Sequence, residues 1–324
     1  MKRRELLLAL GCAPALAHAQ PARDTAEAWP TRPVKLIVPF APGGPTDVIA
    51  RLVAERVQTG WRQPVVLEYK PGAGTVVGTQ FVATSPADGY TLGMAISALM
   101  VNPSLQPKLP YDTAKDLAGV SQLALSHFGL FAHPSLPVAN LAELIAYGKK
   151  NPGKLSYATP GTGTGTHLAG EMLNQMAGLD MVHVPYKGSV PAQQDVIGGR
   201  VPLLFDVMFS ALPFVRDGRL RSLALASPRR AESNPDIPLI SESLPGFSAM
   251  SIIGIIAPRA APRELVRRIS ADIARAVRSP EVRERFAQLG TEAVGSTPEE
   301  YDALIKSEID KWAAVVKSRG IKIE

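Results

Sequence analysis

The feature of this sequence that most constrains its fold is a repeated local pattern. A short apolar run ends in a turn rich in Gly and Pro, and apolar residues at helical spacing follow. The first copy has its apolar run at residues 34–40, its turn at 41–46 and its helical stretch from Asp47. A second copy runs from residue 65 to residue 84. Repeated strand, turn and helix segments predict parallel βαβ units, whose binding sites lie at the carboxyl ends of the strands.

The pattern continues along the chain and then returns. The same criteria predict strands at 90–95, 117–125, 128–132, 155–159, 181–184, 202–206 and 252–257, and helices at 141–151, 167–177, 191–198, 263–278, 280–289 and 298–317. The last helices need a sheet to cover, so we expect the chain to return to its first lobe at about Ser251. The predicted fold is an α/β pair of hinged lobes joined by two crossovers. Lobe 1 would comprise 20–126 plus 251–324, and lobe 2 would comprise 127–250.

Length and composition agree with two globular lobes. With 324 residues, of which 46% are hydrophobic and 20% charged, the chain can bury two cores and is neither disordered nor fibrous in composition. The formal net charge is +6, but the basic residues are dispersed and no nucleic-acid motif accompanies them. We therefore expect no nucleic-acid partner, whereas a mildly positive protein would attract anionic solutes. Because no long heptad or repeat is present, we expect a monomer.

The N-terminus predicts export. Basic residues at 2–4 precede an apolar run at 6–16, and small residues at 17–19 offer a cleavage point. Residues 1–19 are therefore predicted to be a signal peptide, which places the mature chain in the periplasm. The pattern leaves both Sec and twin-arginine export open. The only cysteine, Cys12, lies in this segment and also permits a lipoprotein signal; cleavage after residue 19 would leave no disulfide, thiolate nucleophile or cysteine metal ligand.

The first glycine-rich turn, at residues 39–47, has the composition of an anion site. Gly43 and Gly44 let the backbone approach a ligand closely. The N–H groups at the start of the next helix lie at the positive end of its dipole. Asp47 could cap that helix. Because many βα turns contain two glycines, this turn alone leaves a purely structural role open.

A second turn, at residues 159–167, alternates Thr with Gly. Hydroxyl donors therefore stand beside glycine N–H groups, so a carboxylate could receive several hydrogen bonds without a basic side chain. The turn lacks the Gly-Lys-Ser/Thr ending of a nucleotide P-loop, and its glycine spacing is not that of a dinucleotide site. A carboxylate is the expected anion, and a phosphate is the alternative.

The sequence predicts neither a metal site nor a catalytic site. His167 and His183 lie near the second turn without a third ligand of suitable spacing, and we expect His167 to support the turn by hydrogen bonding. No Gly-x-Ser-x-Gly motif occurs, and the turn threonines have no evident base. We therefore expect no enzyme activity, no metal and no cofactor.

Several motifs together resemble the substrate-binding proteins of tripartite tricarboxylate transporters, the Bug family. They include VKLIVPFAPGG at 34–44, LEYKPGAG at 67–74, GTGT at 161–164 and HVPYKG at 183–188, and the likeness covers nearly all of the mature chain. The resemblance implies a two-lobed, type II-like periplasmic solute-binding protein that closes on a small carboxylate. It also implies delivery to the small and large membrane subunits of such a transporter. An input protein of a signalling system would share the same cleft, and a secreted enzyme is the remaining alternative.

The resemblance further implies which residues line the cleft. The first lobe would contribute Phe40, Ala41, Gly44, Asp47, Gly74, Thr75, Ser97 and Ala98. The second lobe would contribute Gly161, Thr162, Gly163 and Thr164, with Tyr186 and Asp206 at the far end. Asp206 would either bond to an amine or hydroxyl of the ligand or cap a turn. Residues 96–100 are more apolar than is usual in the family, so we expect the distal part of the ligand to be less polar than a tricarboxylate.

Overall fold

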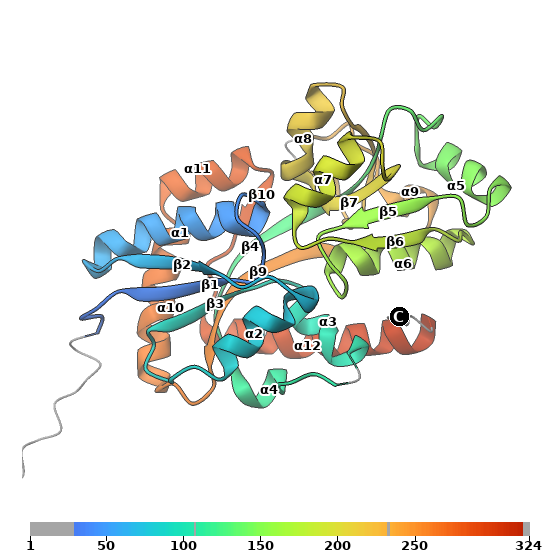
Figure 1. Cartoon of the computed structure of the whole chain (residues 1–324). Coiled ribbons are helices and arrows are strands. Elements are labelled where there is room, and N and C mark those ends of the chain that lie inside the picture. Colours follow the sequence, from blue (N-terminus) through green and yellow to red (C-terminus); the bar gives the residue numbers. More distant parts are fainter. Residues whose placement is uncertain (1–28, 107, 232–233, 320–324) are drawn as a thin grey trace, which may run out of the picture.

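The computed structural model describes residues 29–106, 108–231 and 234–319. The predicted signal peptide at 1–19, with Cys12, lies outside the described residues. Figure 1 shows two groups of helices and strands side by side, with β4 and β9 running between them. This arrangement is the two-lobed α/β fold that the sequence predicts.

The first lobe is built from βα units at the start of the chain and a mainly helical segment at its end. The N-terminal part contains β1 (Val34–Val38), α1 (Pro45–Trp61), β2 (Val65–Tyr69), η1 (Ala73–Thr75), α2 (Val76–Ala83), β3 (Thr91–Ala95), α3 (Ala98–Leu105) and α4 (Thr113–Asp116). The chain returns as β9 (Met250–Pro258), α10 (Arg263–Val277), α11 (Pro280–Gln288), β10 (Thr291–Ala293) and α12 (Pro298–Arg319). Contacts of α12 with α3 and β4 tie the end of the chain to this lobe.

The second lobe repeats the strand, turn and helix pattern. It is entered through β4 (Leu117–Ala132) and contains α5 (Leu141–Lys150), β5 (Ser156–Thr159), α6 (Gly165–Ala177), β6 (Val182–Pro185), α7 (Ser189–Ile197), β7 (Leu203–Val207), α8 (Met208–Arg216), β8 (Arg221–Leu225) and α9 (Ile240–Ser243). In Figure 1, β5, β6 and β7 lie among these helices, away from α1 and α2.

The strands of both lobes join in the order β2-β1-β3-β9-β4-β7-β5-β6, and β10 and β8 each pair with β4. β4 pairs antiparallel with β9 over 117–127 and with β7 over 128–132. The sequence prediction of two strands in this region is wrong, because β4 is one strand of 16 residues. His127 is polar, but it does not end the strand. Its ring is buried and paired with Ser227, whose hydroxyl lies 2.7 Å from Nδ1 of His127.

Local sequence explains where the helices that border the cleft begin. Pro45 occupies the start of α1, where its missing N–H removes no helical bond. Thr164 caps α6 by accepting a hydrogen bond from the His167 N–H. In α10, apolar residues at helical spacing, such as Ile269 and Ile273, are buried in the first lobe. Among the helices of the described residues, none combines the length and the apolar character needed to cross a bilayer.

Several short elements were not predicted from the sequence. Both α3 and α8 contain an internal proline, Pro103 and Pro213, and proline usually ends a helix. The strand β10 has only three residues. These elements exist because they pack on neighbours that are distant in the sequence, and local patterns carry little signal for such packing.

Candidate binding cleft

A cavity lies between the two lobes, where the turns that follow the strands meet the crossing strands β4 and β9. The empty space in and around it, including open solvent at its mouth, is about 480 Å³. Its walls come from the first lobe (Phe40, Gly44, Pro45, Thr46, Ile96, Ser97), from the second lobe (Pro160, Thr164, Gly165, Thr166, Ser189, Asp206, Val207) and from the crossing strands (Phe128, Ser251, Ile253). We call this space the inner cavity.

The N-terminal ends of α1, α3, α6, α7 and α8 all border the inner cavity. Each helix presents the positive end of its dipole there, and the N–H groups of a first helical turn have no acceptor within the helix. None of the residues that line the cavity is Lys, Arg or His. The cavity can therefore hold an anion through backbone groups and helix dipoles from both lobes.

The turn of the first lobe is held by Asp47. Its buried carboxylate accepts hydrogen bonds from the Gly43 N–H (2.8 Å), from the Tyr69 hydroxyl (2.7 Å) and from Nε of Arg51 (3.1 Å). Burial alone would raise the pKa of Asp47, but these hydrogen bonds outweigh it and hold the pKa below its usual value. Asp47 does not cap α1. The N-cap of this helix is Gly44, and the Asp47 carboxylate accepts its backbone hydrogen bond from Gly43, the residue before the N-cap.

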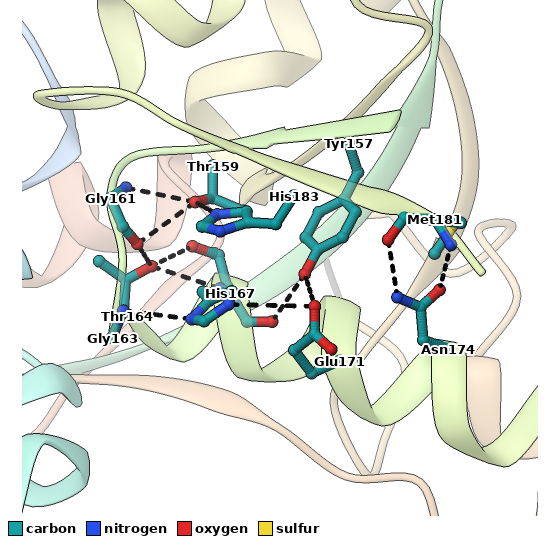
Figure 2. Close-up of polar contacts among 11 residues, drawn as sticks. Tyr157, Thr159, Gly161, Gly163, Thr164, His167, Glu171, Asn174, Met181 and His183 are labelled. Atoms are coloured by element: carbon teal, nitrogen blue, oxygen red, sulfur yellow. Dashed lines mark hydrogen bonds and ion pairs between the residues drawn. The ribbon is translucent and has the colours of Figure 1, made fainter. Parts of the chain in front are cut away.

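The turn of the second lobe is held by a chain of polar side chains, drawn in Figure 2. The Thr164 hydroxyl donates to the Gly161 carbonyl (2.7 Å), and Thr159 accepts from the Gly161 N–H (3.3 Å). The Gly163 N–H donates to Nδ1 of His167 (3.2 Å), and Nε2 of His183 lies 2.7 Å from the Thr159 hydroxyl. The prediction that His167 supports this turn by hydrogen bonding is confirmed.

The two histidines of this network form a buried stack. Their ring centroids are 4.0 Å apart, and the planes differ by 22°. Burial lowers the pKa of His167 to about 4, and burial together with the neighbouring His167 lowers the pKa of His183 to about 3. Both rings are therefore neutral near pH 7, and Nδ1 of His167 is free of a proton to accept the bond from Gly163.

Two side chains that the sequence predicts to contact the ligand, Ser97 and Tyr186, instead form hydrogen bonds within the protein. The Ser97 hydroxyl accepts from the Ile252 N–H (3.0 Å) and donates to the Met250 carbonyl (3.2 Å), so it fastens the start of α3 to β9. The Tyr186 hydroxyl donates to the Asp195 carboxylate (2.6 Å). Ser97 thus lines the inner cavity while its hydroxyl is already paired with β9.

Of the residues that line the inner cavity, Asp206 is the one with an acidic side chain. It lies near the end of β7 and is fully buried. One carboxylate oxygen accepts from the Ser189 hydroxyl and the Val207 N–H, both at 2.7 Å, and the other accepts from the Gln193 amide at 2.8 Å. Burial raises the pKa of Asp206 to about 6, although these hydrogen bonds oppose the rise.

The turns of the two lobes touch each other directly. The Ala41 N–H donates to the Lys187 carbonyl across the cleft (3.4 Å). Gly74 lies against the Thr162 carbonyl, and Gly163 lies beside the side-chain oxygen of Asn102 on α3. The structure therefore shows the lobes closed over the inner cavity.

The predicted site residues fall into three groups. Phe40, Gly44, Ser97, Thr164 and Asp206 line the inner cavity. Gly74, Thr75, Gly161, Thr162 and Tyr186 line an adjoining outer recess of about 530 Å³, which Phe40 also borders. Ala41, Asp47, Ala98 and Gly163 line neither space; Ala41 bridges the lobes, Asp47 and Gly163 shape their turns, and Ala98 is buried in α3.

Sequence reasoning missed several residues of the inner cavity. Phe128, Ser251 and Ile253 come from the crossing strands, and only the assembled sheet brings them to the cavity. Ser189 begins α7 after a third glycine-containing turn, so the rule that identified the first two turns could have found it.

Within the described part of the chain, no three or more His, Cys, Asp and Glu side chains are grouped so that they could hold a metal ion. His167 and His183 stack instead of converging on a common point. The polar groups around the cavity are therefore hydrogen-bond donors and acceptors, not a set of metal ligands.

Comparisons with known proteins give consistent relatives. A family model described as "Tripartite tricarboxylate transporter family receptor" matches residues 49–321. Among solved structures, the periplasmic binding protein BugD is 32% identical with a TM-score of 0.88, covering 91% of this chain and 100% of that one. Rpa4515 of R. palustris, solved with adipate, is 33% identical with a TM-score of 0.88, covering 91% and 99%. MatC from Rhodopseudomonas palustris, solved with bound malate, is 32% identical with a TM-score of 0.85, covering 89% and 100%.

Proposed function

This chain belongs to the tripartite tricarboxylate transporter receptor family, as its motifs suggested, and from that premise we propose that it captures a small carboxylate and presents it to the membrane subunits of a transporter. The family and its solved neighbours are periplasmic binding proteins, not enzymes. The binding step is expected to occur in the periplasm after removal of residues 1–19, with the protein as a monomer and without turnover of the ligand.

The observation that carries this proposal is the convergence of helix N-termini from both lobes on a cavity lined by no basic side chain. Such a site stabilises a carboxylate by N–H groups and helix dipoles, and it gains these donors only when the lobes close. Adipate and malate in Rpa4515 and MatC are carboxylates, which supports the same ligand class for this chain.

The proposed binding residues are the predicted set, with a distinction between direct and supporting roles. Gly44 and Thr164 border the inner cavity and would contact the ligand, whereas Asp47 and Gly163 would act by shaping the turns. The proposed lobe boundaries are those of the sequence prediction, and the partner strand of β4 changes one residue beyond the first of these boundaries, after His127.

The mature chain from Gln20 would be tested by thermal shift and calorimetry against monocarboxylates, dicarboxylates and tricarboxylates. Saturating ligand should stabilise the protein by about 3 kcal/mol at a hundredfold excess over the dissociation constant. The Gly44→Val variant places a side chain at a cavity wall where the backbone tolerates one, with φ at −84°. It should lose binding and remain folded, whereas Gly60→Val, in open space on the same helix, should bind as the parent does.

Gly163→Val, which pushes against Asn102, should also weaken binding. Binding by both the Gly44→Val and Gly163→Val variants at the parent's affinity would show that the site is wrong. A product found after incubation with a bound acid would contradict the absence of turnover. Loss of uptake when the chain is deleted from cells that keep the membrane subunits would test the transporter partnership.

A further inference from the structure

A second hollow lies on the face of the sheet opposite the inner cavity. His127 and Phe128 are neighbours on β4, so their side chains point to opposite faces. Phe128 lines the inner cavity, and His127 lines this hollow, which we call the rear groove. The empty space in and around it, including open solvent, is about 960 Å³. Its polar lining residues are His127, Arg229, Arg230, Arg283, Thr291 and Glu292.

The rear groove takes residues from both proposed lobes. Arg229 and Arg230 follow β8 in the second lobe, whereas Arg283 on α11 and Glu292 on β10 belong to the first. The strand β10 pairs with β4 and contacts α11, which brings these side chains to one place (Figure 1). None of these residues lines the inner cavity or the outer recess, so the rear groove is a separate space.

The rear groove contains guanidinium groups with N–H donors to spare. Arg230 is paired with Glu242 (2.8 Å), and Nη2 of Arg229 reaches both carboxylate oxygens of Glu292 (2.5 Å). Within the described residues, Nε and Nη1 of Arg229 have no partner, and the exposed guanidinium of Arg283 has none at all. These N–H groups can bind an oxyanion from both lobes.

His127 adds a hydrogen-bond acceptor to these donors. Its ring is only 4% exposed. Nδ1 lies 2.7 Å from the Ser227 hydroxyl, which lies 2.9 Å from the Arg229 carbonyl. A carbonyl only accepts, so the serine proton goes to Arg229, and Nδ1 carries the proton that it shares with Ser227. The neutral ring then has a bare Nε2, to which no described residue donates.

Burial keeps this ring neutral, because it lowers the pKa of His127 below its usual value. The nearby charges act more weakly and oppose each other: Glu292 raises the pKa and Arg229 lowers it. A buried acceptor without a donor is costly. A ligand of the rear groove should therefore accept hydrogen bonds from guanidinium groups and donate one to Nε2 of His127.

We propose that the rear groove binds inorganic phosphate, with oxygens on the guanidinium groups of Arg229 and Arg283 and a P–OH group that donates to Nε2 of His127. Inorganic phosphate keeps at least one proton on its oxygens throughout the neutral pH range, and sulfate keeps none. A carboxylic acid loses its proton above about pH 5, and a phosphate monoester loses its second proton above about pH 6. Of these anions, inorganic phosphate alone offers both acceptors and a donor at pH 7.5.

The test is calorimetry of the mature chain from Gln20 at pH 7.5, with phosphate and sulfate titrated at constant ionic strength. Phosphate should bind at least about tenfold more tightly than sulfate, because sulfate leaves Nε2 of His127 without a donor. Glycerol 3-phosphate, a monoester, and dimethyl phosphate, a diester, should also bind less tightly than inorganic phosphate. Absence of phosphate binding, or equal or tighter binding of any of the other three anions, would overturn the inference.

The Arg283→Gln variant tests the location of the site. It should weaken phosphate binding at least about fivefold, since it removes a guanidinium that has no other partner among the described residues. Arg285→Gln is the matched control, because it makes the same change at an exposed position on α11 outside the groove. It should bind phosphate as the parent does. Parental affinity in Arg283→Gln, or an equal loss in both variants, would contradict the proposed site.

The His127→Asn variant isolates the role of Nε2. Asparagine keeps a donor near the place of Nδ1 for Ser227 and removes Nε2, so the preference for phosphate over sulfate should disappear. His127→Gln can place an amide oxygen near the position of Nε2 and should retain part of the preference. An undiminished preference in a folded His127→Asn protein would refute the role of Nε2. If that variant does not fold, the comparison of anions on the parent and the Arg283→Gln variant still decide the inference.

The Gly44→Val variant separates the rear groove from the inner cavity. It alters a wall of the inner cavity and no residue of the rear groove, so it should bind phosphate with the parent's affinity. Loss of phosphate binding in Gly44→Val, with binding retained in Arg283→Gln, would place the phosphate in the cleft between the lobes and overturn the inference.

Discussion

Gly74 of the first lobe lies so close to Thr162 of the second that a Cβ at position 74 would stand 1.7 Å from the Thr162 carbonyl oxygen. The two residues belong to turns that close over the cleft from opposite sides. Glycine at this position is therefore a condition for full closure, and its backbone is also left-handed, with φ at 58°.

Replacement of Gly74 by alanine should hold the lobes apart and weaken ligand binding by at least about tenfold, because full closure would force the new methyl group into the opposite backbone. Gly178→Ala is the matched control. It has nearly the same backbone conformation, with φ at 65° and ψ at 46°, and open space around its Cα. Both variants should lose similar stability, about 1 kcal/mol, and only Gly74→Ala should lose affinity in calorimetry. Parent-like affinity would contradict this role.

Asp47→Ala should destabilise the protein by about 1–3 kcal/mol, because it removes the acceptor for the Gly43 N–H and for the Tyr69 hydroxyl. Ligand affinity should fall as well, since the turn that borders the cavity loses its anchor. Glu55→Gln, an exposed change on the same helix, should alter neither quantity in denaturant unfolding and calorimetry. A folded Asp47→Ala protein with unchanged stability and affinity would exclude the anchoring role.

Acid should destabilise the protein through His167 and His183. Their pKa values in the folded protein, about 4 and about 3, lie below the usual 6.5. The unfolded chain therefore binds their protons first, and the stability that they contribute is complete above pH 6.5 and is lost as the pH falls toward 4. Each histidine contributes a slope of up to about 1.4 kcal/mol per pH unit.

The His183→Phe variant isolates this effect. It keeps an aromatic ring against His167 and removes one titrating group. The slope of unfolding free energy against pH between 6.5 and 4 should be smaller than the parent's by up to about 1.4 kcal/mol per unit. Asp206 acts in the opposite direction in both proteins, because its raised pKa favours the folded state at low pH. Identical slopes in urea titrations at several pH values would refute the prediction.

Ser97→Ala should cost about 1 kcal/mol of stability and leave the order of ligand preference unchanged. The hydroxyl bonds to Met250 and Ile252, so its removal loosens the junction of α3 with β9 and removes no ligand contact. A variant with parental stability and a reordered preference among acids would show instead that the hydroxyl contacts the ligand.

The turns of the cleft were predictable because their signals are local. Gly and Pro mark the turn after β1, and the alternating Thr and Gly residues mark the turn before α6, which begins within two residues of its predicted start. The bonding of Ser97 was not predictable. Its partners lie more than 150 residues away along the chain, and nothing near residue 97 indicates them.

The continuity of β4 was not predictable for a related reason. Ser126 and His127 resemble a polar break, but both are buried and bonded, to Thr291 and Ser227, once the crossing strands assemble. The sequence likewise left two roles open for Asp206. The structure supplies its neighbours, and they are neutral donors around a buried charge that faces the cavity.

The pairing of His127 with Met250 has a consequence for how such a protein can be rebuilt. Everything between these two positions leaves the first lobe and re-enters it at the same place, so to that lobe the segment is a long insertion whose ends are already held together. The entropy of closing a loop grows only slowly with its length, so such an insertion can be exchanged for another with similarly spaced ends. Segments equivalent to 128–249 could be exchanged between relatives on a common first lobe. Each segment would supply its own second-lobe half of the binding cleft.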